Sequence, residues 1–249
     1  MLGIASHFID FGGKMKNTKN LLFVVIGLLV IAIVGGTFAL NSINQKDPNP
    51  VIINTPTPTD EPESPLILKN QINKDAVLWI TLEGCEIDNP VFQGDTNEEY
   101  LRIDENGEGN IWGSYFLDYI NVIENGAFTD KVNIIYGHSY LDVVEDKKFS
   151  KLKRYKDKDF AKENPTIDLE FLEGDSQWEI FAATDVPITI DYIDPNPDDK
   201  KYQATLDYML DNSYVDFGVD VTTDDQILVL STCTSNEDVR FTIAAKLVK

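Results

Sequence analysis

Three side chains whose types suit nucleophilic catalysis lie at the ends of predicted strands. Cys233 closes the apolar run 226–233, His138 follows the apolar run 133–137, and Arg240 opens the next strand after the cysteine. A cysteine nucleophile needs a neighbouring base or cation that favours its thiolate, and a tetrahedral intermediate needs a donor for its oxyanion. An imidazole and a guanidinium can fill these two roles. Cys233, His138 and Arg240 therefore form a candidate catalytic set.

Each of these residues alone has a simpler interpretation. A free cysteine after an apolar strand is usually a buried core residue, and a lone histidine beside a glycine is more often structural. The chain has two cysteines, which could form at most one disulfide, so the fold must rest on its core. For the second cysteine, Cys85, we expect the simpler role of a buried bystander.

Composition excludes several function classes. The chain has 249 residues, 43% of them hydrophobic, which allows one domain of ordinary size plus appendages. Its formal net charge of −21 repels nucleic acid backbones, so we expect no nucleic-acid partner. With two histidines and two cysteines a zinc site is improbable, and the acidic residues lack the regular loop spacing of a calcium site. We expect no metal and no cofactor.

Residues 21–40 contain no charged side chain and follow Lys14, Lys16 and Lys19. A helix of about twenty apolar residues spans the hydrocarbon core of a bilayer, and lysines on one side place that side in the cytoplasm. We therefore expect residues 1–20 to be a cytoplasmic segment and residues 21–40 an uncleaved transmembrane anchor, with the rest of the chain outside the cell. A cleaved signal peptide is the alternative, but its apolar core is shorter, about 7–15 residues.

The segment that follows the apolar stretch differs in composition from the rest. Residues 41–65 are rich in Pro, Thr, Asn and acidic side chains and show no apolar period, which predicts an extended, poorly ordered linker. From residue 66 onward apolar runs alternate with turn signals. We expect residues 66–249 to form one domain that folds alone and stays monomeric.

This domain has the pattern of a mostly β fold. Strand signals recur about eight times, and residues 166–187 read as a hairpin. Two stretches, 147–164 and 197–213, have helical features. The pattern predicts a closed, eight-stranded β-barrel with short helical insertions, preceded by the N-terminal transmembrane helix.

Several motifs resemble those of the sortases, the membrane-anchored cysteine transpeptidases of Gram-positive surfaces. These motifs are YGHS (136–139), LSTC (230–233) and RFTIAAK (240–246). Further stretches resemble class B sortases in particular: 87–101, 113–118, 149–167 and 198–212. The resemblance covers about residues 66–249, and the N-terminal anchor agrees with it.

The resemblance implies a role for each candidate residue. Cys233 would attack the Thr carbonyl of a C-terminal sorting motif of the Asn-Pro-x-Thr or Ser-Pro-x-Thr kind and form a thioacyl enzyme. His138 would protonate the leaving amine and then deprotonate the incoming one. Arg240 would hold the oxyanion or position the substrate, and Ser231 and Thr232 would contribute to substrate binding.

The resemblance also implies partners. They are surface proteins that carry the sorting motif, and a peptidoglycan precursor of the lipid II type that supplies the amine. The basic run 147–158 is expected to form a solvated helix face, with electrostatic contact to anionic wall polymers as the alternative.

Two other functions stay open. A pilus-assembling sortase would use a lysine of another pilin as the amine, but such enzymes often carry an N-terminal lid and a second membrane helix, and we expect neither here. A non-catalytic extracellular adhesion module is the other alternative. The complete set of His138, Cys233 and Arg240 argues against it.

Overall fold

The computed structural model describes residues 63–139 and 147–248. The predicted cytoplasmic segment (1–20), the predicted anchor (21–40) and residues 41–62 of the predicted linker lie outside these ranges. Within the two ranges, no helix is both long and apolar enough to cross a bilayer. The domain boundaries and the anchor therefore remain predictions.

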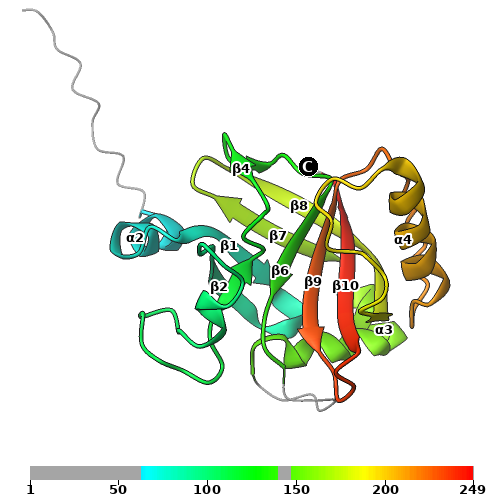
Figure 1. Ribbon diagram of the computed structural model, residues 1–249, viewed down its shortest axis with the longest axis horizontal. Helices are drawn as coiled ribbons and strands as arrows, with labels where there is room; N and C mark the ends of the chain where they lie inside the picture. The colour runs from blue at the N-terminus through cyan, green and yellow to red at the C-terminus, as the bar shows by residue number, and fades with distance from the viewer. Residues whose placement is uncertain (1–62, 140–146, 249) are drawn as a thin grey trace, which may run out of the picture. The chain divides into compact units, whose positions relative to one another are not determined.

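Among the residues that the structure describes, eight strands close into a barrel, as the sequence predicts (Figure 1). Two neighbouring pairs, β2–β3 and β6–β9, are parallel, and the other pairs are antiparallel. Pairing of the last strand with the first leaves the sheet without a free edge. In spatial order the strands are β1 (Ala76–Leu82), β2 (Ile87–Phe92), β3 (Tyr115–Leu117), β6 (Val132–Tyr136), β9 (Ile227–Cys233), β10 (Val239–Leu247), β8 (Gly174–Pro187) and β7 (Thr166–Phe171).

The predicted hairpin is β7–β8, and a second, smaller hairpin lies outside the barrel. It pairs β4 (Ile123–Glu124) with β5 (Ala127–Phe128). Asn125 and Gly126 form its two-residue turn with positive φ values of 51° and 73°. Positive φ at both central residues is the requirement of a type I′ turn, which Asn-Gly satisfies best.

Helices α2 and α4 both begin at side-chain caps. Ser64 caps α2 (Pro65–Ile72), and Asp198 caps α4 (Asp199–Asp211), each by accepting a hydrogen bond from the first turn. Helix α4 confirms the second predicted helical stretch. Helix α2 was not predicted, because its residues follow directly on the Pro-rich segment and are too few to show a helical period. Two short 3₁₀ helices, η1 (Glu83–Cys85) and η2 (Glu99–Leu101), complete the N-terminal half.

The first predicted helical stretch consists of two pieces. The 3₁₀ helix η3 (Lys148–Lys156) is followed by α3 (Lys158–Glu163), and Asp157 separates them and caps α3. The large apolar side chains of η3 recur every three residues, which matches the three-residue turn of a 3₁₀ helix. All three are fully buried: Phe149, Leu152 and Tyr155.

The expectation that the basic run forms a solvated face is wrong for part of η3. Lys151 and Lys153 are each only 6% exposed. The Nζ of Lys151 lies 2.8 Å from Glu86 Oε2, and the Nζ of Lys153 donates to Ser139 Oγ at 2.8 Å. Long lysine stems can cover apolar surface while their ammonium groups reach polar partners. Lys147, by contrast, is exposed.

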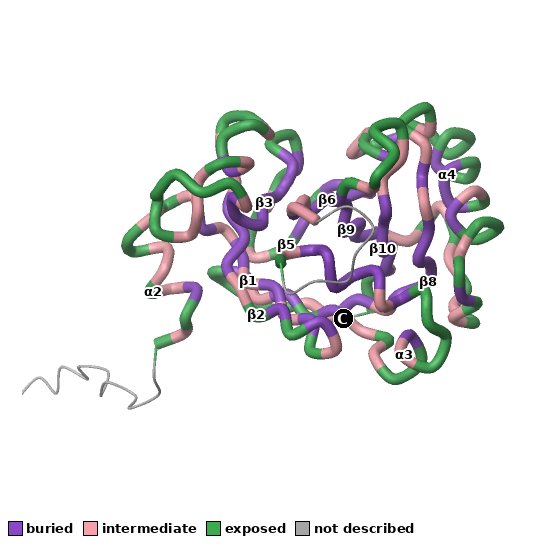
Figure 2. The backbone as a smooth tube through the Cα atoms, turned by 90° about the horizontal axis from the view of Figure 1, so that it is seen from below, coloured by how far each residue is buried: buried purple, intermediate pink, exposed green. Residues whose placement is uncertain are grey.

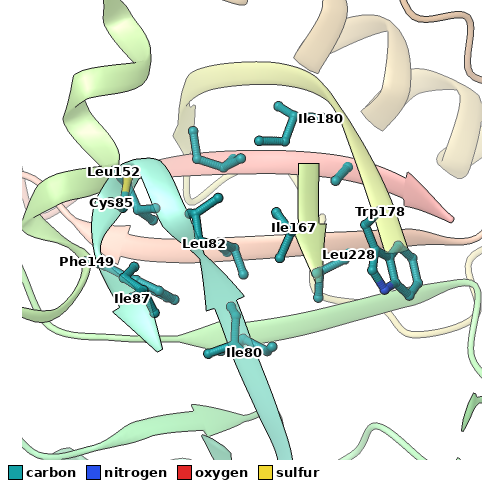
Figure 3. Close-up of a cluster of buried hydrophobic side chains, with 14 of the residues drawn as sticks. Ile80, Leu82, Cys85, Ile87, Phe149, Leu152, Ile167, Trp178, Ile180 and Leu228 are labelled. Carbon is teal, nitrogen blue, oxygen red and sulfur yellow. The ribbon is translucent and has the colours of Figure 1, made fainter. Parts of the chain in front are cut away.

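The barrel interior is one apolar cluster with side chains from all eight strands. Figure 3 shows part of it, with Cys85 beside Leu152, and with Ile80 and Leu82 of β1 in the same group of side chains as Ile167 of β7. The buried apolar side chains of η3 belong to the same cluster. Burial of so much apolar surface is the main term that stabilises such a domain.

A second apolar cluster lies between α4 and the outer face of the barrel. It joins Tyr202, Leu206 and Met209 of α4 to residues of β6, β8, β9 and β10. Figure 2 shows α4 as a helix with one buried and one exposed side. Strand β9 is therefore covered on both faces, and six of its seven residues are buried, with Cys233 as the exception.

Candidate active site

Strand β9 lies between β6 and β10, and this arrangement brings the candidate residues to one rim of the barrel. In the parallel β6–β9 pair, Tyr136 lies opposite Ser231, and in the antiparallel β9–β10 pair, Arg240 lies opposite Cys233. His138 is two residues beyond Tyr136, as Cys233 is two residues beyond Ser231. The parallel register therefore brings the histidine and the cysteine to the same level, on neighbouring strand ends.

A cavity of about 570 Å³ opens at this rim. His138, Cys233 and Arg240 all line it. Its mouth is apolar on the side of the segment after β8, where Ile188 and Ile193 line the cavity and are 53% and 48% exposed. A concave, largely apolar site with a few convergent polar groups is the usual form of a substrate-binding site.

The thiol of Cys233 is accessible. Cys233 is exposed, although the preceding residues of β9 are buried. The interpretation of this cysteine as a buried core residue is therefore wrong. Its position at the end of a rigid strand, in the wall of a cavity, suits a nucleophile, since attack requires both access and a fixed direction.

His138 is half-buried and held by the backbone of another segment. Its Nε2 lies 2.9 Å from the carbonyl oxygen of Leu101. Because a carbonyl oxygen can only accept, Nε2 carries the proton of the neutral imidazole and Nδ1 is left as the basic nitrogen. Burial lowers the pKa of His138 below its ordinary value of 6.5, the Leu101 carbonyl opposes this, and the positive charges of Arg102 and Lys148 lower it further.

The guanidinium of Arg240 is held by backbone carbonyl oxygens of the residues that precede it. Nη1 donates to the carbonyl oxygens of Glu237 at 2.7 Å and Val239 at 3.1 Å. These two are the hydrogen bonds of the guanidinium within the described ranges, and they leave the Nη2 and Nε donors for a ligand in the cavity. An arginine with part of its fork already fixed is a preorganised donor for an oxyanion.

Ser231 and Thr232 also line the cavity, but both hydroxyls have partners in the protein. Thr232 Oγ1 donates to the carbonyl oxygen of Gly137 at 2.6 Å, and Ser231 Oγ lies 2.9 Å from the hydroxyl of Tyr192. The Thr232 bond ties the end of β9 to the residue before His138. Ser231 is 1% exposed and Thr232 is 3% exposed, so both hydroxyls are held within the rim.

A buried carboxylate behind the cavity wall was missed by the sequence reasoning. Asp118 is 2% exposed, and its Oδ2 accepts hydrogen bonds from Tyr136 Oη at 2.8 Å and Asn97 Nδ2 at 3.0 Å. Tyr136 and Asn97 both line the cavity. Asp118 ends the stretch 113–118, one of those that resemble class B sortases. The sequence does not show which segments its carboxylate connects.

Cys85 lies apart from this rim. It is fully buried in the barrel cluster, and its Sγ lies 3.5 Å from the carbonyl oxygen of Lys151. Burial raises the pKa of the Cys85 thiol to about 12, although Arg154 and Lys151 oppose this shift. A thiol with so high a pKa is inert as a nucleophile at neutral pH, which agrees with the bystander role that we expected.

The described ranges contain no group of three or more His, Cys, Asp or Glu side chains arranged to hold a metal ion. The polar side chains that line the active-site cavity carry a thiol, an imidazole, a guanidinium, two phenols, two hydroxyls, one amide and one carboxylate, that of Asp191. The thiol, the imidazole and the guanidinium are the groups that covalent acyl transfer uses.

Comparison with known proteins agrees with this arrangement. Sortase B of Staphylococcus aureus (strain NCTC 8325 / PS 47) is 33% identical over 183 residues, and sortase B of Listeria monocytogenes serovar 1/2a (strain ATCC BAA-679 / EGD-e) is 35% identical over 182 residues. Each match covers 72% of this chain and 72% of the relative. No protein-family model matches the sequence.

Solved structures give the same result. The 2.0 Å crystal structure of S. aureus sortase B has a TM-score of 0.66 and 33% identity, and covers 74% of this chain and 86% of that chain. A substrate complex of S. aureus sortase B matches with a TM-score of 0.66 at 32% identity (74% and 84% covered), and a sortase B complexed with Gly3 with 0.64 at 34% (72% and 83%).

The barrel and its thiol-bearing rim thus define a cysteine transpeptidase of the sortase type. At this identity and coverage, the chain belongs to the class B sortase family, whose members act in anchoring proteins to the cell wall.

Proposed function

We propose that this protein cleaves a C-terminal sorting motif of the Asn-Pro-x-Thr or Ser-Pro-x-Thr kind after the threonine and transfers the surface protein to an amine of a peptidoglycan precursor. One observation carries the proposal. The exposed Cys233, the half-buried His138 and the loop-held Arg240 line one cavity, from three adjacent strand ends. This is the set of groups that acyl transfer through a thioester requires.

In the first half-reaction, His138 holds the proton of the Cys233 thiol as an imidazolium, and the Cys233 thiolate attacks the threonine carbonyl carbon. The carbonyl oxygen becomes an oxyanion, which the free Nη2 and Nε donors of Arg240 stabilise. The intermediate collapses, the peptide C–N bond breaks, and the leaving amine takes a proton from the imidazolium of His138. The threonine is then joined to Cys233 as a thioester.

In the second half-reaction, the acceptor amine attacks the thioester carbonyl. The neutral imidazole of His138 takes its proton, the C–S bond breaks, and a new amide joins the surface protein to the acceptor. The lowered pKa of His138 favours the neutral form at pH 7. That form is the base of the second half-reaction, so the imidazolium of the first half-reaction is the minority form.

Relatives support the two substrate classes. A solved S. aureus sortase B structure is a substrate complex, and another sortase B structure holds Gly3, which carries a free amine. The cavity here is open at an apolar mouth, which suits a peptide that enters from outside.

The membrane anchor is part of the same proposal. Residues 21–40 are uncharged and follow three lysines, so they would hold the enzyme in the cell membrane with its N-terminus in the cytoplasm and its barrel outside. Protease treatment of intact protoplasts tests this orientation. Digestion of the barrel, with a tag on the N-terminus protected, is expected; a protected barrel would contradict it.

Cleavage and transfer are tested with a quenched peptide that contains either motif, with and without triglycine as the acceptor. Cys233→Ala is expected to abolish both reactions, because no other accessible thiol is present in the described ranges. Cys85→Ala is the matched control and should keep turnover within a few-fold. Without acceptor, mass spectrometry should show the peptide fragment attached to Cys233. Turnover in Cys233→Ala would refute the mechanism.

A further inference from the structure

Asp191 carries a carboxylate in the active-site cavity that the proposed reaction does not use. Among the described residues that line the cavity with Cys233, it is the one acidic side chain, and Arg240 is the one permanent cation. Asp191 is exposed, and its side chain has no hydrogen-bond or ion-pair partner in the part of the chain that the structure describes. The carboxylate is therefore available to a ligand in the cavity.

The segment that carries Asp191 is held in place on both sides. The next residue, Tyr192, is 6% exposed, and its hydroxyl lies 2.9 Å from Ser231 Oγ of β9. The backbone N–H of Tyr192 donates to the carbonyl oxygen of Ile190 at 3.0 Å, and that of Ile190 donates to Pro187 at 2.9 Å. An aspartate side chain is short, so a fixed backbone confines its charge to a small region. A confined charge discriminates between ligands with little further loss of conformational entropy.

This charge is close to the place where the peptide is cut. Ser231 and Cys233 are two residues apart on β9, so their side chains point to the same face of the sheet. The hydroxyl of Tyr192 contacts this face, and the Cα of Asp191 is one residue away, about 3.8 Å along the chain. A long side chain of the peptide residue next to the cleaved threonine can therefore reach the carboxylate of Asp191.

The surroundings of Asp191 suit a basic side chain. Ile188 and Ile193 line the same part of the cavity, and a lysine stem packs on such apolar surface while its ammonium reaches a carboxylate. Arg240 is the opposing charge, but its guanidinium is held by the backbone carbonyl oxygens of its own loop and makes no ion pair with Asp191 within the described ranges. An acidic peptide side chain at this place would meet the like charge of Asp191.

We propose that Asp191 makes the enzyme select a sorting motif with a basic side chain at the variable position x, directly before the threonine. The inference rests on the proposed cleavage function and deepens it at one substrate position. The other positions of the proposed motif are Asn or Ser, Pro and Thr, which carry no charge, so x is the position in the motif that a carboxylate can select. An exposed ion pair is weak, so the selection is a few-fold.

The test uses the full-length enzyme and quenched motif peptides with lysine, acetyl-lysine or glutamate at x. Acetylation keeps the stem and removes the charge. The lysine peptide is expected to have a kcat/KM about three- to fivefold above that of the acetyl-lysine peptide, which is the range of an exposed ion pair. Asp191→Asn should bring this ratio to about one, and Asp191→Lys should reverse the order in favour of glutamate, because the sign of the charge is then reversed.

A matched control separates Asp191 from the general acidity of a chain with a net charge of −21. Asp238 is an exposed carboxylate on the loop between β9 and β10, outside the cavity lining, so Asp238→Asn should keep the ratio. Circular dichroism checks the fold of each variant. High salt should lower the ratio in the unchanged enzyme, because salt screens exposed charges.

Three results would each overturn the proposal. They are equal kcat/KM values for the lysine and acetyl-lysine peptides, an unchanged ratio in well-folded Asp191→Asn, and an equal loss of the ratio in Asp238→Asn. If the unchanged enzyme cleaves none of the three peptides, the proposed function itself is refuted, so the two failures are distinguishable.

Discussion

The two cysteines allow the interior of this barrel to be compared with its rim. Cys85 ends η1 inside the apolar cluster, where burial raises the pKa of its thiol to about 12. Cys233 ends β9 at the mouth of the active-site cavity and is exposed. The two residues have the same chemistry, and both follow an apolar strand. Cys85 lies inside the barrel and Cys233 lies at its edge. The position of each cysteine relative to the closed sheet therefore decides its reactivity.

The largest expected effect tests this comparison directly. At pH 8, a thiol with a pKa of about 12 is deprotonated in only about one molecule in 10⁴, and the thiolate is the reactive form. A thiol-reactive probe should therefore modify Cys233 at least about 10³-fold faster than Cys85, which burial also shields. Peptide mapping by mass spectrometry measures both rates. Similar rates in the folded protein would remove the distinction between interior and rim.

The next effect concerns the donor at the rim. Arg240→Ala should lower kcat by about 10²–10³, the usual loss when one oxyanion donor is removed. Arg240→Lys should also fail badly, because a single ammonium does not replace a planar fork of donors. Steady-state cleavage of the sorting peptide measures both variants, and circular dichroism checks the fold. Full activity in Arg240→Lys would show that charge alone suffices.

A smaller effect is expected behind the cavity wall. Asp118→Asn places an amide where one carboxylate oxygen accepts hydrogen bonds from Tyr136 and Asn97. Loss of a hydrogen bond to a charged group costs about 1.5–3 kcal/mol, so KM for the sorting peptide should rise about tenfold while kcat changes less. Thr205→Ser, on the buried side of α4 and outside the active-site cavity, is a control for general loosening of the barrel. An unchanged KM would reduce Asp118 to a structural role.

The smallest effect concerns the charge near His138. Arg102 lowers the pKa of the imidazole, since a positive neighbour disfavours the imidazolium. Arg102→Gln removes that charge, so the pKa of His138 should rise. The limb of the pH–rate profile that reports this pKa should then move to higher pH. Arg102→Lys keeps the charge and should leave the pKa in place. Titration of the imidazole by NMR in a Cys233→Ala background gives the value without a coupled thiol. A fall in pKa after Arg102→Gln would contradict this account.

The sequence predicts those parts of the structure that depend on local pattern. Alternating apolar residues and the turn between β7 and β8 indicate strands, and strand ends place Cys233, His138 and Arg240 at the edge of a sheet. The residue types then suggest acyl transfer. Their convergence on one cavity follows from the order of strands, which the pattern alone does not give but the resemblance to sortases does.

What the sequence does not predict depends on pairing between distant segments. Asp118 meets Tyr136 and Asn97 because β3 pairs with β2 on one side and β6 on the other. Likewise, the sequence favours exposed positions for the lysines of η3, because charge in a sequence does not indicate how much of each methylene stem is buried. Only tertiary contact with Glu86 and Ser139 shows that Lys151 and Lys153 lie inward.

The position of β9 between β6 and β10 has a consequence for how the enzyme fails when it is heated. The nucleophile is on β9, the strand that leads to the imidazole pairs on one side of it, and the strand that carries the guanidinium pairs on the other. Since the sheet is closed, none of these strands is an edge that can fray first. We therefore expect thermal inactivation to coincide with melting of the whole barrel, so that the global unfolding rate sets the half-life of the active site at a given temperature.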